Sequence, residues 1–179
     1  MKELPKRKHP RLKGYNYSRS GAYFITFCVK GGHELLGEIV GRDTLGAPTA
    51  IILPYIKLSE YGNIIHKEIE DTYLYYSNIS VNKFVVMTNH VHIIAIINNG
   101  DGVPRALTGV PRASRPTATI PSFISVLKKK TNKAVGFNIW QDSYHDRIIR
   151  NEDEYKRIWQ YIDENPAKWY EDRYYKKET

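Results

Sequence analysis

Two apolar, β-branched runs near the middle of the chain most strongly limit how it can fold. They cover residues 81–87 and 90–97, and only Thr88 and Asn89 separate them. Short runs rich in Val and Ile are typical of strands, and such a brief connection favours an antiparallel pair. The sequence therefore predicts a β-hairpin over these residues.

The segments before the hairpin predict one strand and one helix. Residues 21–30 (GAYFITFCVK) are aromatic and β-branched, which is typical of a buried strand. Residues 41–50 have the composition of a loop. From about residue 54 to residue 75, apolar side chains recur near helical spacing. We therefore expect one amphipathic helix there, with its middle weakened by Gly62.

The segments after the hairpin predict a helix, a strand and a further helix. Residues 121–135 have helical periodicity, and residues 139–149 read as a short loop followed by a strand. The last helix should begin near Asn151, because Asn151 and Glu154 have the spacing of a capping box. It should end near Asn165, since the next residue is a proline, which disfavours helical geometry in the residue before it.

The resulting order, β-α-β-β-α-β-α, predicts an α+β fold. It matches a ferredoxin-like antiparallel sheet (β-α-β-β-α-β) with an extra C-terminal helix. A length of 179 residues suits one domain of ordinary size. We expect residues 21–179 to form that domain, preceded by a basic arm at residues 1–20. A flexible loop is expected at residues 98–119, where GVPRA occurs twice.

The composition excludes several classes of protein. No apolar run approaches the roughly 18 residues of a membrane span, and no apolar segment follows the basic N-terminus as in a secretory signal. Cys28 is the only cysteine, which excludes a disulfide scaffold and a zinc site built from thiolates. We therefore expect a small cytoplasmic protein with no membrane partner.

Positive charge is concentrated in two segments. The formal net charge is +8; residues 1–20 hold seven basic side chains and one acidic, and residues 102–150 hold nine and two. This distribution favours nucleic acid as a partner, although charge that serves only solubility would give the same pattern. The arm also carries tyrosines, which could stack on unpaired bases. The candidate DNA-binding side chains are Lys6, Arg7, Lys8, Arg11, Lys13, Tyr15, Tyr17 and Arg19 in the arm and Lys128, Lys129 and Lys130 on the helix at 121–135.

The sequence His90-Val91-His92 is the main chemical signal. Alternate side chains of a strand share one face, so both imidazoles should project from the same surface of the sheet. Two neutral imidazoles placed in this way form half of a site for a divalent metal ion. The motif is short, and two partly exposed histidines without a ligand remain the alternative interpretation.

The last predicted helix carries two further candidates. Tyr161 and Asn165 are four residues apart and therefore share a face, at the edge of the apolar stripe of that helix. The amide oxygen could complete a site of two histidines and one oxygen, and the phenol could act as a nucleophile. Packing at a helix–sheet contact is the alternative role for the tyrosine.

Four segments together resemble a known family. They are YSRSGAYFITF, VVMTNHVHIIAII, WQDSYHDRIIRNEDEY and YIDENPAKW, in this order. They resemble the REP-associated tyrosine transposases, which are Y1 transposases within the HUH group of single-strand nucleases. The resemblance covers nearly the whole chain except residues 41–53 and the loop at 98–119, which is longer than the family needs.

The resemblance implies a function and assigns roles to residues. It implies a metal-dependent endonuclease and strand transferase that acts on single-stranded DNA with REP-like hairpins through a 5′-phosphotyrosine. His90 and His92 match the metal-binding histidines, Tyr161 the catalytic tyrosine, and Asn165 the third ligand of Mg²⁺ or Mn²⁺. The arm resembles the segment that reads a guide sequence at the foot of the hairpin. A bacterial, nucleoid-associated location follows, and both a monomer and a homodimer are compatible with the family.

Two other functions are weighed against this one. A non-catalytic protein that binds single-stranded nucleic acid on a ferredoxin-like sheet would leave His90 and His92 as ordinary surface residues. A two-histidine phosphoesterase acting on cyclic phosphates would need a second His-x-Ser/Thr motif, and the sequence has none.

Overall fold

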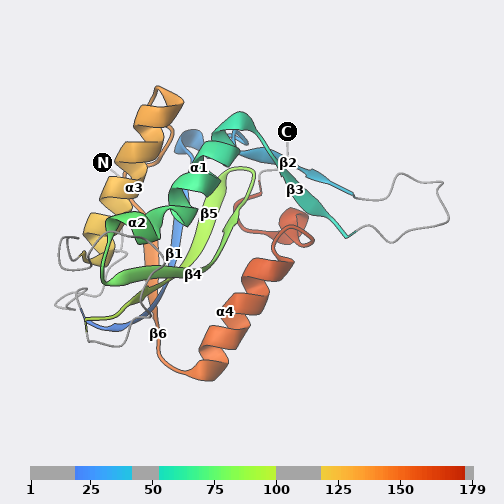
Figure 1. The fold of residues 1–179 in the computed structure, drawn as a ribbon. Helices are drawn as coiled ribbons and strands as arrows, with labels where there is room; N and C mark the ends of the chain where they lie inside the picture. The colour runs from blue at the N-terminus through green and yellow to red at the C-terminus, as the bar shows by residue number, and fades with distance from the viewer. Residues whose placement is uncertain (1–18, 42–52, 100–117, 176–179) are drawn as a thin grey trace, which may run out of the picture.

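A four-stranded antiparallel sheet lies at the centre of the computed structural model, which describes residues 19–41, 53–99 and 118–175 (Figure 1). Its strands lie in the order β4-β5-β1-β6, and each neighbouring pair is antiparallel. This order confirms the predicted ferredoxin-like α+β fold. The strands are β1 (Gly21–Cys28), β4 (Ile79–Val86), β5 (His90–Ile97) and β6 (His145–Ile149).

Helices cover both faces of this sheet, as Figure 1 shows. One face is covered by α1 (Glu60–Glu70) and α3 (Ile120–Val135), whose apolar side chains join the larger hydrophobic core. The short helix α2 (Thr72–Tyr75) follows α1 and lies against β4. The opposite face is covered by α4 (Glu152–Glu164), the predicted extra C-terminal helix, through a smaller apolar cluster.

Strand alternation divides the side chains of β1 and β5 between these two cores. On β5, Val91 and Ile93 point into the larger core, whereas Ile94 joins the cluster beneath α4. His90 and His92 alternate with the first group, so they lie on the α4 face. Every residue of β5 except Ile96 is buried, which explains why its sequence is apolar almost throughout.

A second, two-stranded sheet formed by β2 (Gly37–Val40) and β3 (Tyr55–Leu58) corrects one prediction. The helix expected from residue 54 begins only at Glu60, and it is broken at Asp71 before α2. The sequence Tyr-Ile-Lys-Leu alternates between exposed and half-buried positions, which is the period of a strand. Four residues of this kind also fit a helical pattern, which is why periodicity misassigned them.

Gly62 has a different role from the one expected. A Cβ atom at this position would lie 2.0 Å from the carbonyl oxygen of Leu36, so the absence of a side chain lets α1 approach this segment closely. The start of α1 is fixed beside it, because the Ser59 side chain accepts a hydrogen bond from the backbone N–H of Gly62. The glycine is therefore a packing requirement of the helix start.

The other predicted elements are confirmed with small shifts. The hairpin is formed by β4 and β5, and α3 begins one residue early with a capping box between Thr119 and Ser122. Asn151 caps α4, but the carboxylate of Glu154 accepts from the backbone N–H of Arg150 instead of closing a box with Asn151. The helix ends at Glu164, as expected.

Several predictions fall on residues that the structure does not describe. They include the arm up to residue 18, nearly all of the expected loop at residues 41–50, and residues 100–117 of the loop expected at 98–119. Among the described helices, none combines the length and the apolar character needed to cross a membrane.

Candidate active site

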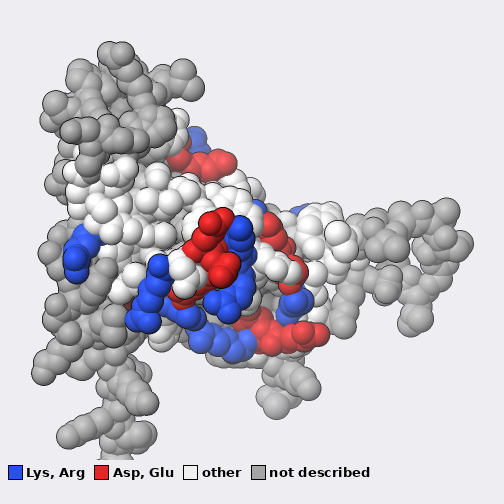
Figure 2. Space-filling model, turned by 90° about the horizontal axis from the view of Figure 1, so that it is seen from below, with Lys and Arg blue, Asp and Glu red and all other residues white. Residues whose placement is uncertain are grey.

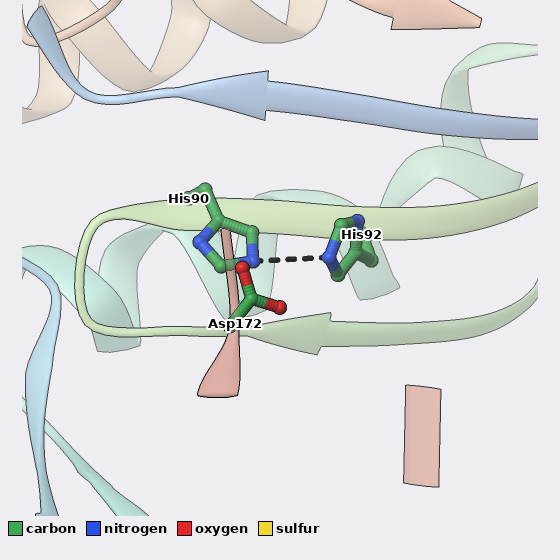
Figure 3. Close-up of side chains that lie close together, drawn as sticks. All are labelled: His90, His92 and Asp172. Carbon is green, nitrogen blue, oxygen red and sulfur yellow. Dashed lines mark hydrogen bonds between the residues drawn. The ribbon is translucent and has the colours of Figure 1, made fainter. Parts of the chain in front are cut away.

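His90 and His92 meet on the α4 face of the sheet. Their Nε2 atoms are 3.0 Å apart, and the two rings face the same point from strand β5 (Figure 3). Their exposed fractions are 0% and 1%. The alternative of two partly exposed surface histidines is therefore wrong.

Neighbouring side chains fix the orientation of both rings. Nδ1 of His90 lies 2.9 Å from Oδ1 of Asn89, and Nδ1 of His92 lies 2.7 Å from Oγ1 of Thr26. A carboxamide oxygen can only accept, so Nδ1 of His90 carries the proton and its Nε2 presents a lone pair. Thr26 is paired with His92 across the sheet, which explains why its hydroxyl reaches the ring. Hydrogen bonds of this kind also orient metal-binding histidines.

Burial keeps both imidazoles neutral. It lowers the pKa of His90 to about 4, against a smaller raising effect of the Asp172 carboxylate. Burial also lowers the pKa of His92 well below its usual value, and the proximity of His90 adds to this effect. The neutral imidazole is the form that binds metal ions, so the pair is ready for a cation at neutral pH.

Asp172 brings a carboxylate to the pair. One oxygen of Asp172 and one nitrogen of each histidine all lie within 4.8 Å of one another, an arrangement that could hold a divalent metal ion (Figure 3). The backbone N–H of Tyr174 donates to Oδ1 of Asp172 at 2.8 Å and so orients the carboxylate. The aspartate follows the short turn Trp169–Glu171, in which Trp169 is buried and its ring lies 5.9 Å from that of His90.

Sequence reasoning missed Asp172, because its place in the site depends on how the segment after α4 folds back. No spacing rule links it to His90 and His92. The only signal is indirect: Trp169, Tyr174 and Tyr175 follow the last helix, and such an aromatic segment tends to dock on the body of a protein.

Tyr161 reaches the same point from α4. Its hydroxyl lies 3.1 Å from Nε2 of His92 and donates to Oδ2 of Asp172 at 3.0 Å. Ile158 and Ile162 anchor the helix on the sheet, while Tyr161 itself remains 39% exposed. Burial, followed by the neighbouring carboxylate, raises the pKa of the phenol above its usual value.

Asn165 is joined to the site through Asp172. Its Nδ2 donates to Oδ2 of Asp172 at 3.0 Å, and the residue is 2% exposed. Its Oδ1 is buried, and no described residue donates a hydrogen bond to it. A buried amide oxygen without a donor is costly, and a cation would satisfy it.

The donor set fits a divalent cation. The two Nε2 atoms are 3.0 Å apart, close enough for both to bind one such ion. Asp172 adds a hard oxygen donor, which Mg²⁺ and Mn²⁺ prefer, whereas Asn165 faces that carboxylate with its Nδ2.

The predicted DNA-binding residues do not gather around this site in the described part of the chain. Lys128 donates to backbone oxygens of Gln141 and Ser143, and Lys130 lies over the ring of Tyr75, 3.8 Å from a carboxylate oxygen of Glu68. These lysines and the exposed Lys129 belong to α3, which lies on the other face of the sheet from α4.

Of the remaining basic candidates, the structure describes only Arg19. Arg19 is exposed, and its carbonyl accepts from the hydroxyl of Tyr23. In the view of Figure 2, Lys and Arg side chains are interspersed with Asp and Glu. The other arm candidates, Lys6, Arg7, Lys8, Arg11, Lys13, Tyr15 and Tyr17, lie outside the described residues. DNA binding by all these residues therefore stays a prediction.

Comparison with known proteins gives a relative over almost the full length. No protein-family model matches the chain. A Haemophilus influenzae protein described as uncharacterized is 32% identical over an alignment of 180 positions, which covers 94% of this chain and 93% of that protein. The chain belongs to one family with the Haemophilus protein.

Solved structures extend this result to the fold. A REP-associated tyrosine transposase bound to a REP hairpin matches 89% of this chain and 74% of its own, with 20% identity and a TM-score of 0.58. The chain has the fold of the Y1 transposases. A candidate transposase of Deinococcus radiodurans covers 86% of this chain and 95% of its own at 16% identity, but its TM-score of 0.45 is too low to establish a shared fold.

The Y1 transposase fold accounts for the position of the site. The ferredoxin-like sheet brings the histidine pair to the face that α4 covers, and α4 then brings the tyrosine onto the pair. The resemblance that the sequence predicts is thus confirmed for the fold.

Proposed function

We propose that this chain is a metal-dependent endonuclease and strand transferase of single-stranded DNA that acts on REP-like hairpins. One observation carries the proposal. The hydroxyl of Tyr161 lies within hydrogen-bonding distance of both His92 and Asp172, which are two members of the candidate metal site. A nucleophile in this position would lie beside a phosphate held at that site, where a cation would supply Lewis-acid stabilisation.

His90, His92 and Asp172 would hold the cation, and Asn165 would orient the carboxylate of Asp172 through its Nδ2. Two imidazoles favour Mn²⁺ by ligand preference, whereas availability favours Mg²⁺. When bound, the ion supplies Lewis-acid stabilisation of the charge that develops on the phosphate.

The remaining chemistry belongs to the side chains of the chain. The phenolic oxygen of Tyr161 forms a bond to phosphorus, and the bond between phosphorus and the 3′ oxygen of the preceding nucleotide breaks. The products are a 5′-phosphotyrosine and, after the leaving oxygen takes up a proton, a free 3′-hydroxyl. Because the energy of the phosphodiester is kept in the new bond, the reverse step joins strands.

Asp172 is the proposed acceptor of the phenolic proton. The phenol is protonated at neutral pH, since burial and the neighbouring carboxylate raise its pKa. Its proton must therefore leave as the bond to phosphorus forms. Oδ2 of Asp172 already accepts the hydrogen bond of that proton, so it needs no rearrangement to take it.

The site is built from one chain. The tyrosine, both histidines and the aspartate all come from the described chain, with their contacts formed inside it. A monomer therefore suffices for the proposed reaction. Because the proposed substrate is DNA, we still predict a cytoplasmic, nucleoid-associated location.

The non-catalytic alternative accounts less well for the site. A protein that only binds nucleic acid has no need for two buried, neutral imidazoles whose Nε2 atoms face each other. Burial of such polar groups is costly. The same groups are useful when a cation binds between them.

Adduct formation tests the proposal. The probe is a set of hairpin oligonucleotides with single-stranded tails, incubated with the protein and Mn²⁺, and the adduct is identified by mass spectrometry of the modified peptide. Tyr161→Phe should abolish the adduct and leave hairpin binding intact. Tyr155→Phe is the matched control, because this tyrosine is on the same helix and its hydroxyl accepts from Asn82 instead. A full-strength adduct in Tyr161→Phe would overturn the proposal.

A further inference from the structure

A pocket of about 460 Å³ lies beside the candidate active site, between α4 and the β6 edge of the sheet. This volume is within the range of pockets that bind small ligands. Tyr161 and His92 line one side of it, so a group bound there would lie directly beside the proposed nucleophile.

The register of the sheet builds the floor of this pocket. Thr26 of β1 pairs with His92 on one side and His145 on the other, and Phe24 pairs with Arg147. All of these side chains line the pocket, and Ile158 of α4 adds an aliphatic wall. The lining thus offers an aromatic ring and an aliphatic side chain, and Asp146 of β6 adds an acidic residue to it.

Arg147 stands at the rim and is held in place. One of its guanidinium nitrogens lies 2.5 Å from Oε1 of Glu154, whose side chain is 8% exposed against 68% for Arg147. The other oxygen of Glu154 accepts from the backbone N–H of Arg150, which fixes the carboxylate. A guanidinium carries five N–H donors, so this ion pair leaves others available to a ligand.

A second guanidinium, that of Arg173, lines the pocket from the segment that supplies Asp172. Two guanidinium groups around a partly aromatic interior match the chemistry of a nucleotide. The base would lie in the interior, and the donors would contact its edge or its phosphate.

We infer that this pocket holds one unpaired nucleobase next to the scissile phosphate and that Arg147 reads its edge. The inference rests on the proposed function and names a sequence preference for it. Guanine is the expected base, because its O6 and N7 atoms match the two donors of a guanidinium. Arg147 is then a specificity-determining residue.

The test uses covalent capture. The probe is a library of hairpin oligonucleotides whose single-stranded tail contains eight randomised nucleotides, incubated with the full chain and Mn²⁺. Sequencing of the captured DNA should show a preference for guanine at one position flanking the cut. Arg147→Ala should reduce this preference about tenfold while adducts still form, and Arg147→Lys should not restore it, since an ammonium cannot form the paired contact.

Arg150→Ala is the matched control, because this exposed arginine is near Arg147 in sequence and does not line the pocket. It should leave the preference unchanged. An unchanged preference in Arg147→Ala, or an equal loss in both variants, would overturn the inference.

A binding measurement separates this inference from the proposed function. Tyr161→Phe protein is titrated with tailed hairpins that carry an abasic site at each tail position in turn, with and without Arg147→Ala, and affinity is read by fluorescence anisotropy. At one position, the abasic site should weaken binding about tenfold with Arg147 present and by less than twofold without it. Equal losses at every position would overturn the inference. A protein that shows this coupling but forms no adduct would instead overturn the proposed reaction.

Discussion

The hydroxyl of Tyr161 lies 3.1 Å from Nε2 of His92, although the two residues are 69 positions apart in the sequence. Two independent placements produce this contact. Strand β5 directs the imidazole to the α4 face. The apolar cluster around Ile94, Ile158 and Ile162 packs α4 on the sheet so that the phenol reaches the imidazole. The contact therefore depends on ordinary core packing as much as on the polar groups themselves.

Replacement of Asp172 by asparagine should weaken both cation binding and chemistry. Asp172→Asn keeps the shape of the side chain but removes its charge and its ability to take a proton. We expect the affinity for Mn²⁺, measured by titration calorimetry, to fall at least about tenfold and adduct formation to fall by about a hundredfold. Glu171→Gln, at the neighbouring exposed carboxylate, is the control. Unchanged values in Asp172→Asn would remove this residue from the site.

The free energy of unfolding should decrease as the pH falls from about 6.5 to about 4. Burial lowers the pKa of His90 to about 4 in the folded chain, whereas an unfolded histidine titrates near 6.5. The unfolded state therefore binds more protons in this interval, and stability is lost as acid is added. Above about pH 7, this group should contribute no pH dependence.

Urea denaturation in the presence of EDTA measures this effect. His90→Asn should reduce the slope of stability against pH and leave the part that comes from His92, which titrates in the same direction. His33→Asn, at an exposed histidine, is the matched control for the substitution itself. Identical slopes in the wild type and in His90→Asn would contradict the assigned cause.

Gly62→Ala should destabilise the fold. The added Cβ would lie 2.0 Å from the carbonyl oxygen of Leu36, a backbone atom that cannot move without displacing the segment before β2. We expect a loss of about 2–4 kcal/mol in the free energy of unfolding. Lys67→Ala, at an exposed position of the same helix, should change it by less than about 0.5 kcal/mol. Equal stability of Gly62→Ala and the wild type would show that the contact relaxes at little cost.

Deletion of residues 1–14 should weaken hairpin binding more than cleavage of a short single strand. This segment carries six basic side chains, which we expect to contact phosphates. Binding of the full chain should therefore fall more steeply with salt than binding of the shortened chain. Anisotropy titrations at several salt concentrations measure both slopes. Equal losses in binding and cleavage would refute this division of labour.

The sequence predicts the central sheet well, because its strands are long and strongly patterned. The run from His90 to Ile97 is buried on both faces, so apolar character alone identifies it. The four-residue strand Tyr55–Leu58 is too short for such a signal, and its alternation also fits the helix that follows. Length of the pattern therefore separates β5, which the sequence predicts, from the four-residue strands β2 and β3, which it does not.

The candidate site also contains residues that the sequence predicts and one that it does not. The histidine pair follows from strand alternation, and the shared face of Tyr161 and Asn165 follows from helical spacing. Asp172 follows from neither, because a turn after α4 and the burial of Trp169 bring it into place. Contacts within one element can be read from spacing, whereas a contact made by a returning segment depends on the packing of the whole chain.

The position of β5 has a consequence for the dynamics of the site. It lies between β4 and β1, hydrogen-bonded on both sides, so its amides can exchange with deuterated water only when the sheet itself opens. Asp172 instead follows a single 3₁₀ turn near the end of the described chain. One half of the site therefore belongs to a strand that is paired on both sides, whereas the other half depends on the burial of Trp169 and on the hydrogen bonds to Asp172.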